Sequence, residues 1–292
     1  MGRTTRVMAI VNCTPDSFSD GGALASPLAI ERRIAEALED GADFLDIGGE
    51  STRPGAPPVP AEEEWARVAP AFEAARRLDC GIPISIDTTK LEVARRALDA
   101  GATIVNDVSA LRFSPGIAAL CAKTGAGLVL MHMRGDPRTM QDDPRYDDVV
   151  AEVREALAAT VATARAAGVA SDRILVDPGI GFGKTVEHNL ELIRHAAALD
   201  GLGAGILIGS SRKGFIGKLL DLPVGERLEG SLATFVCAVL AGAHAVRVHD
   251  VRAAARAVRI ADAVRGDAAH GDDAGGTREE GDTGEEGGES GS

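Results

Sequence analysis

Eight short apolar runs, separated by helix-like stretches, restrict the fold of this chain more than any other feature. They span residues 7–12, 44–49, 83–87, 103–107, 127–132, 174–177, 205–210 and 245–249. Strand and helix alternating eight times predict an α/β fold of the (β/α)8 TIM-barrel class. The strands of such a barrel are all parallel, so their carboxyl ends meet at one rim.

Each of these runs carries a polar residue at or near its carboxyl end. The eight are Asn12, Asp46, Asp87, Asn106, His132, Asp177, Ser210 and His249. A single Asp, Asn or Ser at a strand end commonly does no more than start a turn. Eight polar residues on one rim, taken together, predict a binding or catalytic site there.

The length of 292 residues suits one barrel domain, because such barrels use about 250 residues. We expect this domain to cover residues 1–265. Residues 266–292 hold nine acidic residues, nine glycines and one basic residue, Arg278, and no large apolar residue follows Val264. Such a segment cannot bury enough apolar surface to offset the entropy of ordering it. The sequence therefore predicts a disordered acidic tail.

The charge pattern argues against nucleic acid as a partner. The formal net charge is −13, of which −8 lies in the tail and −5 in the remainder, whereas a phosphate backbone needs a basic stripe. The four cysteines form no C-x-x-C pair, which disfavours a zinc site and indicates reduced thiols. No signal peptide or membrane-spanning stretch stands out, so we expect a soluble cytoplasmic protein without a membrane partner.

Three of the strand-end residues suit a flat heterocycle. Asp87 and Asp177 offer carboxylate acceptors, and Asn106 offers an amide that both donates and accepts, which fits the donor-rich edge of an aminopyrimidinone. Lys213 follows the seventh run and precedes a helix. A cation beside a helix N-terminus favours a carboxylate or a phosphate.

The eighth run offers a second group of candidates. Arg247 and His249 flank Val248, so an extended strand points both toward the same side, and Arg53 in the second loop adds another cation. Together they could supply the positive charge that an anionic ligand needs. Alternatively, Arg247 forms a salt bridge with a rim carboxylate and His249 is a buried, hydrogen-bonded ring.

Long motifs at these strand ends carry a resemblance to a known family. They are NCTPDSFSDGG at 12–22, DIGGESTRPG at 46–55, SIDT at 85–88, ND at 106–107, LMHM at 130–133, DPGIGFGK at 177–184, SRK at 211–213 and RVHD at 247–250. In these motifs, from about Met8 to Val264, the chain resembles the dihydropteroate synthases of bacterial folate biosynthesis.

That resemblance implies a transferase and sulfonamide target. The family joins p-aminobenzoate to 6-hydroxymethyl-7,8-dihydropterin pyrophosphate and releases 7,8-dihydropteroate and pyrophosphate, with Mg²⁺ as cofactor. The implied catalytic residues are Asp87, Lys213, Arg247 and His249.

The resemblance also implies a wider set of ligand-binding residues. By this resemblance, the pterin is bound by Asp87, Asn106, Asp177 and Lys213, and pyrophosphate is bound by Arg247 and His249. Asn12 binds Mg²⁺ and pyrophosphate, and the p-aminobenzoate pocket is flanked by Phe182 and Lys213. The segments that close over the site contain Thr52, Arg53 and the loop around Asp16 and Phe18. Met131, Ser211 and Val248, from the same motifs, complete the substrate-binding set.

Two other functions and one assembly stay open at this point. A pterin-binding barrel could instead pass a methyl group from a methylated folate to a corrinoid partner, or it could bind pterins without turnover as a silent paralogue. An apolar stripe of Leu232, Phe235 and Val239 could pair two copies into a homodimer, or it could face the barrel.

Overall fold

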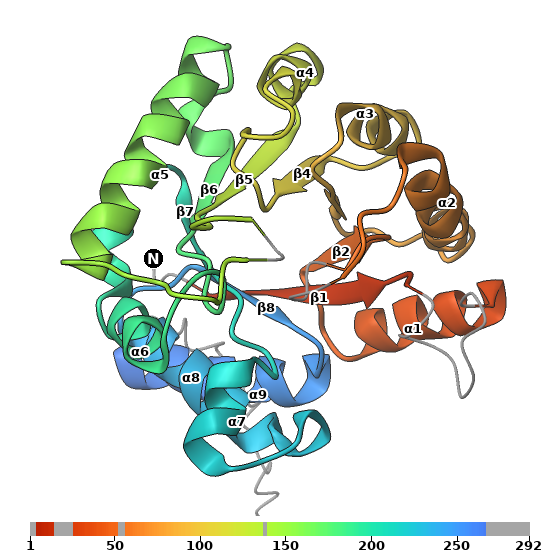
Figure 1. The fold of residues 1–292 in the computed structure, drawn as a ribbon. Helices are drawn as coiled ribbons and strands as arrows, with labels where there is room; N and C mark the ends of the chain where they lie inside the picture. Colours follow the sequence, from red (N-terminus) through yellow and green to blue (C-terminus); the bar gives the residue numbers. More distant parts are fainter. Residues whose placement is uncertain (1–3, 15–25, 52–55, 137–138, 267–292) are drawn as a thin grey trace, which may run out of the picture.

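The computed structural model describes residues 4–14, 26–51, 56–136 and 139–266. Eight parallel strands close into a barrel in which β8 pairs with β1, and the helices surround it (Figure 1). The strands are β1 (Arg6–Asn12), β2 (Phe44–Gly48), β3 (Ile84–Asp87), β4 (Ile104–Asp107), β5 (Gly127–Met131), β6 (Ile174–Asp177), β7 (Gly205–Ile208) and β8 (Ala245–Val248). The predicted TIM-barrel fold is confirmed.

The helices follow the strands around the barrel. They are α1 (Pro27–Glu39), α2 (Ala61–Arg77), α3 (Leu91–Asp99), α4 (Gly116–Thr124), α5 (Val149–Ala166), α6 (Val186–Arg194), α7 (Gly214–Leu220), α8 (Leu228–Leu240) and α9 (Val251–Arg265), with 3₁₀ turns η2 (Ser171–Arg173), η3 (Ala196–Leu199) and η4 (Val224–Glu226). Two helices, rather than one, separate β7 from β8. Asp221 takes a left-handed conformation that ends α7, and Pro223 follows it.

Local signals start the helices, and apolar spacing packs them. Ser26 caps α1 by accepting a hydrogen bond from the backbone of Ala29, and Pro27 occupies the first turn. Ile30 and Ile34 of the same helix are fully buried, one turn apart, against the barrel. This packing buries the outer face of the strands and leaves the carboxyl-end loops to form the rim.

The barrel has one apolar layer outside its strands and another inside them. Inside the barrel, Met8, Val129 and Leu207 pack together below the rim. Phe235 and Val239 of α8 are buried in the outer layer, so the apolar stripe of α8 faces the barrel. Of the two roles that the sequence left open for this stripe, the structure shows the inward one.

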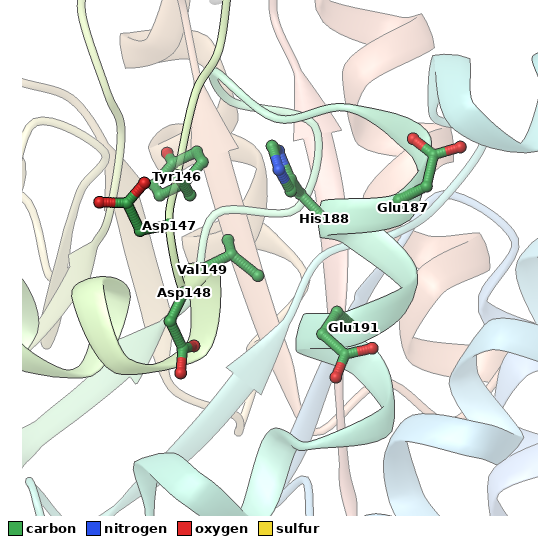
Figure 2. Close-up of a pocket in the computed structure, with 7 residues that line it drawn as sticks. All are labelled: Tyr146, Asp147, Asp148, Val149, Glu187, His188 and Glu191. Carbon is green, nitrogen blue, oxygen red and sulfur yellow. The ribbon is translucent and has the colours of Figure 1, made fainter.

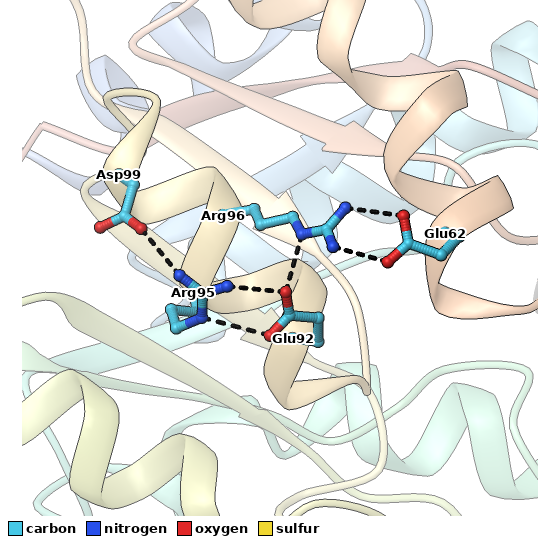
Figure 3. Close-up of polar contacts among 5 residues, drawn as sticks. All are labelled: Glu62, Glu92, Arg95, Arg96 and Asp99. Carbon is cyan, nitrogen blue, oxygen red and sulfur yellow. Dashed lines mark hydrogen bonds and ion pairs between the residues drawn. The ribbon is translucent and has the colours of Figure 1, made fainter.

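Exposed ion pairs link α2 to α3. The guanidinium of Arg96 binds Glu62 of α2 and Glu92 of its own helix, and Arg95 binds Glu92 and Asp99 (Figure 3). Pairs of this kind on a solvated surface each contribute about 0–1 kcal/mol. They orient the outer helices, whereas the buried apolar layers hold the barrel together.

Candidate functional site

A buried cluster of charges lies at the carboxyl end of the barrel. The Nε atom of Arg247 in β8 donates to Oδ2 of Asp46 in β2 at 2.5 Å. The Nη2 atom of the same guanidinium donates to Oδ2 of Asp87 in β3 at 2.7 Å. Asn106 of β4 donates its side-chain amide to Oδ2 of Asp46 at 3.0 Å. Four strands thus contribute to one hydrogen-bonded network below the rim.

Opposing effects in this network act on the pKa of Asp87. Burial raises the pKa of the Asp87 carboxyl, Arg247 lowers it, and the nearby Asp46 raises it further. For Arg247, burial lowers the pKa, but Asp46 and Asp87 outweigh burial and raise it. The guanidinium therefore stays charged while two carboxylates share it.

A second pair of charges lies across the mouth on β6 and α7. Asp177 ends β6 and accepts a hydrogen bond from the backbone of Gly179 at 2.7 Å. Lys213 precedes α7, donates to the carbonyl of Ile180, and places its Nζ atom 4.4 Å from the centre of the Phe182 ring. Burial lowers the pKa of Lys213 to about 8, although Asp177 opposes that shift.

The turn between these two groups requires glycine. Gly179 has a φ of +69°, and a Cβ there would lie 1.8 Å from the carbonyl oxygen of His132. Gly181 has a φ of +83°, and a Cβ there would lie 2.9 Å from the Lys213 side chain. Only glycine combines this left-handed backbone with such close approach. The glycines of the DPGIGFGK motif therefore bring Phe182 and Lys213 together.

His249 is held beside the same mouth as a neutral ring. Its Nδ1 atom lies 2.9 Å from the hydroxyl of Ser211, and its carbonyl accepts from Arg33 at 2.5 Å. Burial first, and then Arg247 and Arg212, lower the pKa of His249 to about 3. The ring therefore offers a hydrogen bond rather than the positive charge that the sequence suggested. Arg247, similarly, makes the rim salt bridges that the sequence left as an alternative.

The other predicted residues have varied surroundings. Asn12 ends β1, and Met131 and Phe182 belong to an apolar cluster beside the mouth. The side chain of Val248 is fully buried in the outer apolar layer, so only its backbone can face a ligand. Thr52, Arg53, Asp16 and Phe18 lie outside the described residues, as does the tail from residue 267.

Two contributors to this region had no assigned role in the sequence. Asp46 appeared only as one of eight strand ends, yet it holds two of the predicted site residues. Lys184 is buried and donates to the carbonyl of Phe182 at 2.9 Å, with its Nζ 3.0 Å from Nδ1 of His132. Its place in the DPGIGFGK motif was the available signal. These contacts tie the glycine turn of residues 179–183 to the end of β5.

A cavity of about 370 Å³ lies away from these strand ends. Its walls come from the segment that enters α5 and from the first turns of α6, and they carry Tyr146, Asp147, Asp148, Val149, Glu187, His188 and Glu191 (Figure 2). None of the eight strand-end residues lines it. We therefore place the candidate site at the charged strand ends.

The described residues contain no group of three or more His, Cys, Asp or Glu side chains arranged to hold a metal ion. The amide of Asn12 supplies one oxygen donor at the rim. Mg²⁺ commonly keeps several waters and takes few protein ligands when it also binds substrate phosphates. The donor set at this rim fits Mg²⁺ held mainly by a phosphate ligand.

Known proteins match the chain over most of its length. A profile of the family described as pterin binding enzyme matches residues 8–249. The dihydropteroate synthase of Synechocystis sp. is 49% identical over 265 residues, which cover 90% of this chain and 91% of that relative.

Solved structures also superpose closely. The Yersinia pestis dihydropteroate synthase in complex with a sulfonamide drug has a TM-score of 0.84 and 42% identity, over 90% of this chain and 95% of its own. The Xanthomonas albilineans dihydropteroate synthase with 4-aminobenzoic acid has a TM-score of 0.82 and 46% identity, over 90% and 93%.

Proposed function

Because this chain belongs to the dihydropteroate synthase family of pterin-binding enzymes, transferases of folate biosynthesis, we propose that the strand-end site described above is where it makes dihydropteroate. In that reaction the bond between the pterin methylene and pyrophosphate breaks. The amine of p-aminobenzoate forms a new C–N bond to the methylene and loses one proton, which the released pyrophosphate can accept.

The pterin would bind between the two charged groups of the mouth. Asp87, Asn106 and Asp177 offer acceptors to a ring edge rich in N–H donors, and Lys213 lies on the far side. The observation that carries this assignment is the burial of Asp87 and Asp177, whose pKa values are both raised by that burial. Carboxylates held in this way gain most from a ligand that donates hydrogen bonds or develops positive charge.

The same carboxylates suit a dissociative reaction. Loss of pyrophosphate from a methylene on an electron-rich pterin leaves a resonance-stabilised cation, which Asp87 and Asp177 would stabilise. Arg247 would transfer part of its pairing from Asp87 to the departing anion, and the neutral His249 would donate a hydrogen bond to it. The amine of p-aminobenzoate would then attack the methylene carbon.

The remaining assignments concern the second substrate and the cofactor. The aryl ring would lie near Phe182, with Ser211, Lys213 and the start of α7 toward its carboxylate. Mg²⁺, when bound, supplies positive charge that favours the departure of pyrophosphate. Asn12 would hold it, and Thr52 and Arg53 would help to cover the site.

The decisive assay follows pyrophosphate release from 6-hydroxymethyl-7,8-dihydropterin pyrophosphate and Mg²⁺, with and without p-aminobenzoate. Release that requires p-aminobenzoate, with dihydropteroate identified by mass, supports the proposal. Pterin binding without release would indicate a silent paralogue. Methyl transfer from a methylated folate to a corrinoid would indicate the methyltransferase.

Among the helices of the described ranges, none combines the length and the apolar composition that a transmembrane segment requires. The cytoplasmic location, the homodimer and the division into a domain of residues 1–265 and an acidic tail stay predictions. Phe235 and Val239 are buried against the barrel, so these two side chains are not available to a partner copy.

A further inference from the structure

We propose that Asp46 is a positioning residue of this site. Its buried carboxylate accepts hydrogen bonds from Asn106 and Arg247. These bonds orient the Asn106 amide oxygen and the Arg247 guanidinium toward the substrate. The inference rests on the proposed function, because it concerns a residue beneath the same pterin pocket.

Both partners meet at one oxygen atom. Oδ2 of Asp46 accepts from Nε of Arg247 at 2.5 Å and from Nδ2 of Asn106 at 3.0 Å. The side chain of Asp46 is 0% exposed, whereas that of Arg247 retains 21% exposure and that of Asp87 retains 13%. A ligand at the rim can therefore reach Arg247 and Asp87 but not Asp46, and Asn106, at 3% exposure, offers it only a small edge of its side chain.

Asp46 decides which end of the Asn106 amide faces the ligand. An ionised carboxylate only accepts hydrogen bonds, so the NH₂ group of Asn106 turns down toward it and the carbonyl oxygen is left for the mouth. Asn106 pairs in register with Asp87 on the neighbouring strand. Two acceptors thus lie side by side, which matches a ring edge that carries adjacent N–H donors. Without the charge on Asp46, the amide could turn and present donors instead.

Asp46 also limits how strongly Arg247 binds Asp87. In the described residues these two carboxylates share the guanidinium, through Nε and Nη2 respectively. If Asp46 lost its charge, Arg247 would be drawn toward Asp87, the other carboxylate with which it forms an ion pair among the described residues. Asp87 would then be less available to the pterin, and Arg247 less available to the leaving anion.

The variant Asp46→Asn tests this by removing the charge while keeping the volume. We expect kcat/KM for the dihydropterin pyrophosphate to fall at least tenfold. The KM for p-aminobenzoate should stay within about twofold, because Asp46 bonds Asn106 and Arg247, and within the described ranges no hydrogen bond joins it to the groups near Phe182 and Ser211.

The pH profile supplies a readout that a purely structural role would not move. Asp87 is faced by Arg247 of β8, Asp46 of β2, Glu64 of α2, Asp107 of β4 and Lys213 beside α7. Of these, Arg247 lowers the pKa of Asp87, whereas Asp46, Glu64 and Asp107 raise it, and Asp46→Asn removes one of the three raising charges. The acid limb of kcat/KM should therefore move to lower pH in Asp46→Asn.

Ser85→Ala is the matched control. Ser85 pairs with Asp46 in the register of β2 and β3, is fully buried, and has no hydrogen-bond partner for its hydroxyl in the described residues. It should keep wild-type kinetics and pH dependence. The inference is overturned if this variant loses as much as Asp46→Asn. It is equally overturned if a folded Asp46→Asn enzyme keeps wild-type kcat/KM, or weakens both substrates alike.

A measurement on the wild-type protein covers the case in which Asp46→Asn does not fold. In protein labelled with ¹⁵N-arginine, the Nε–H signal of Arg247, assigned with Arg247→Lys, should be protected from exchange and stay in place when inorganic pyrophosphate and Mg²⁺ are added. A signal that exchanges freely would refute the anchoring by Asp46. Failure of the wild-type enzyme to release pyrophosphate would instead refute the proposed function.

Discussion

Replacing Asp87 by Asn separates the chemistry of the site from its stability. Asp87 ends β3, retains 13% side-chain exposure, and binds Nη2 of Arg247 at 2.7 Å. The amide has the same shape but no charge. If the carboxylate stabilises a cationic pterin, turnover must fall steeply in this variant while the fold survives.

The size of the effect follows from Coulomb's law. A unit positive charge about 4 Å from a carboxylate, at an effective dielectric constant of about 20, gains about 4 kcal/mol. Loss of that energy slows the chemical step about 10³-fold. The amide dipole keeps part of the interaction, and Asp177 stays in place. We therefore expect kcat to fall about 10²- to 10³-fold.

Stability should change little in the same variant. Arg247 keeps its hydrogen bond to Asp46, so no buried cation is left alone. Burial raises the pKa of Asp87, which means that the folded state favours a neutral group at this position. We expect the free energy of unfolding to change by about 1 kcal/mol or less, equal to about 2–4 °C in Tm for a domain of this size.

In contrast to Asp87→Asn, the variant Asp107→Asn should lose stability and keep its activity. Asp107 ends the neighbouring strand, but its carboxylate accepts from the backbone of Ser109 and Leu111 at 2.8 and 2.7 Å. These bonds hold a turn in which Leu111 has a φ of +67°. The amide cannot accept at both oxygens, so this variant should lose about 1.5–3 kcal/mol of stability and keep kcat within a few-fold.

The comparison uses the pyrophosphate-release assay together with thermal unfolding of both variants. The reasoning fails if Asp87→Asn keeps more than a tenth of wild-type kcat. It also fails if the two variants lose activity and Tm in the same proportion.

Three further predictions concern pH, thiols and metal. Burial lowers the pKa of His132 to about 3 from an unfolded value of about 6.5. The neutral ring therefore contributes its full stability to the folded state above pH about 6.5, and this contribution is lost as the pH falls toward 3. Tm should drop in that pH window, and it should drop less in His132→Gln. Burial raises the pKa of Cys13 and Cys121 to about 12, whereas Cys237 is exposed. A thiol reagent should therefore label Cys237 rapidly in the native protein and all four cysteines only after unfolding. Rapid labelling of native Cys237→Ser would contradict this prediction. Chelation should abolish turnover until Mg²⁺ is restored, and Asn12→Ala should weaken pyrophosphate binding measured calorimetrically with Mg²⁺ but not without it.

The barrel and the side chains at its rim could be predicted from the local pattern of residues along the chain. The apolar runs placed the strand ends within two residues of those observed; the ladder stops at Met131, Ile208 and Val248, so His132, Ser210 and His249 lie just beyond it. Strands can be located from the sequence because the pattern of side chains that marks a strand involves only neighbouring residues. A parallel barrel then places every strand end at the same rim.

The pairing of these side chains, and the protonation states that it favours, could not be predicted before the folded barrel was known. Asp46 and Arg247 are 201 residues apart in the chain, yet a hydrogen bond joins them in the folded barrel, where β1 alone separates their strands. Burial lowers the pKa of His249 to about 3, which favours a neutral ring that bonds the hydroxyl of Ser211. Burial and the distance between charged groups set both outcomes, and these depend on segments that meet only when the barrel closes.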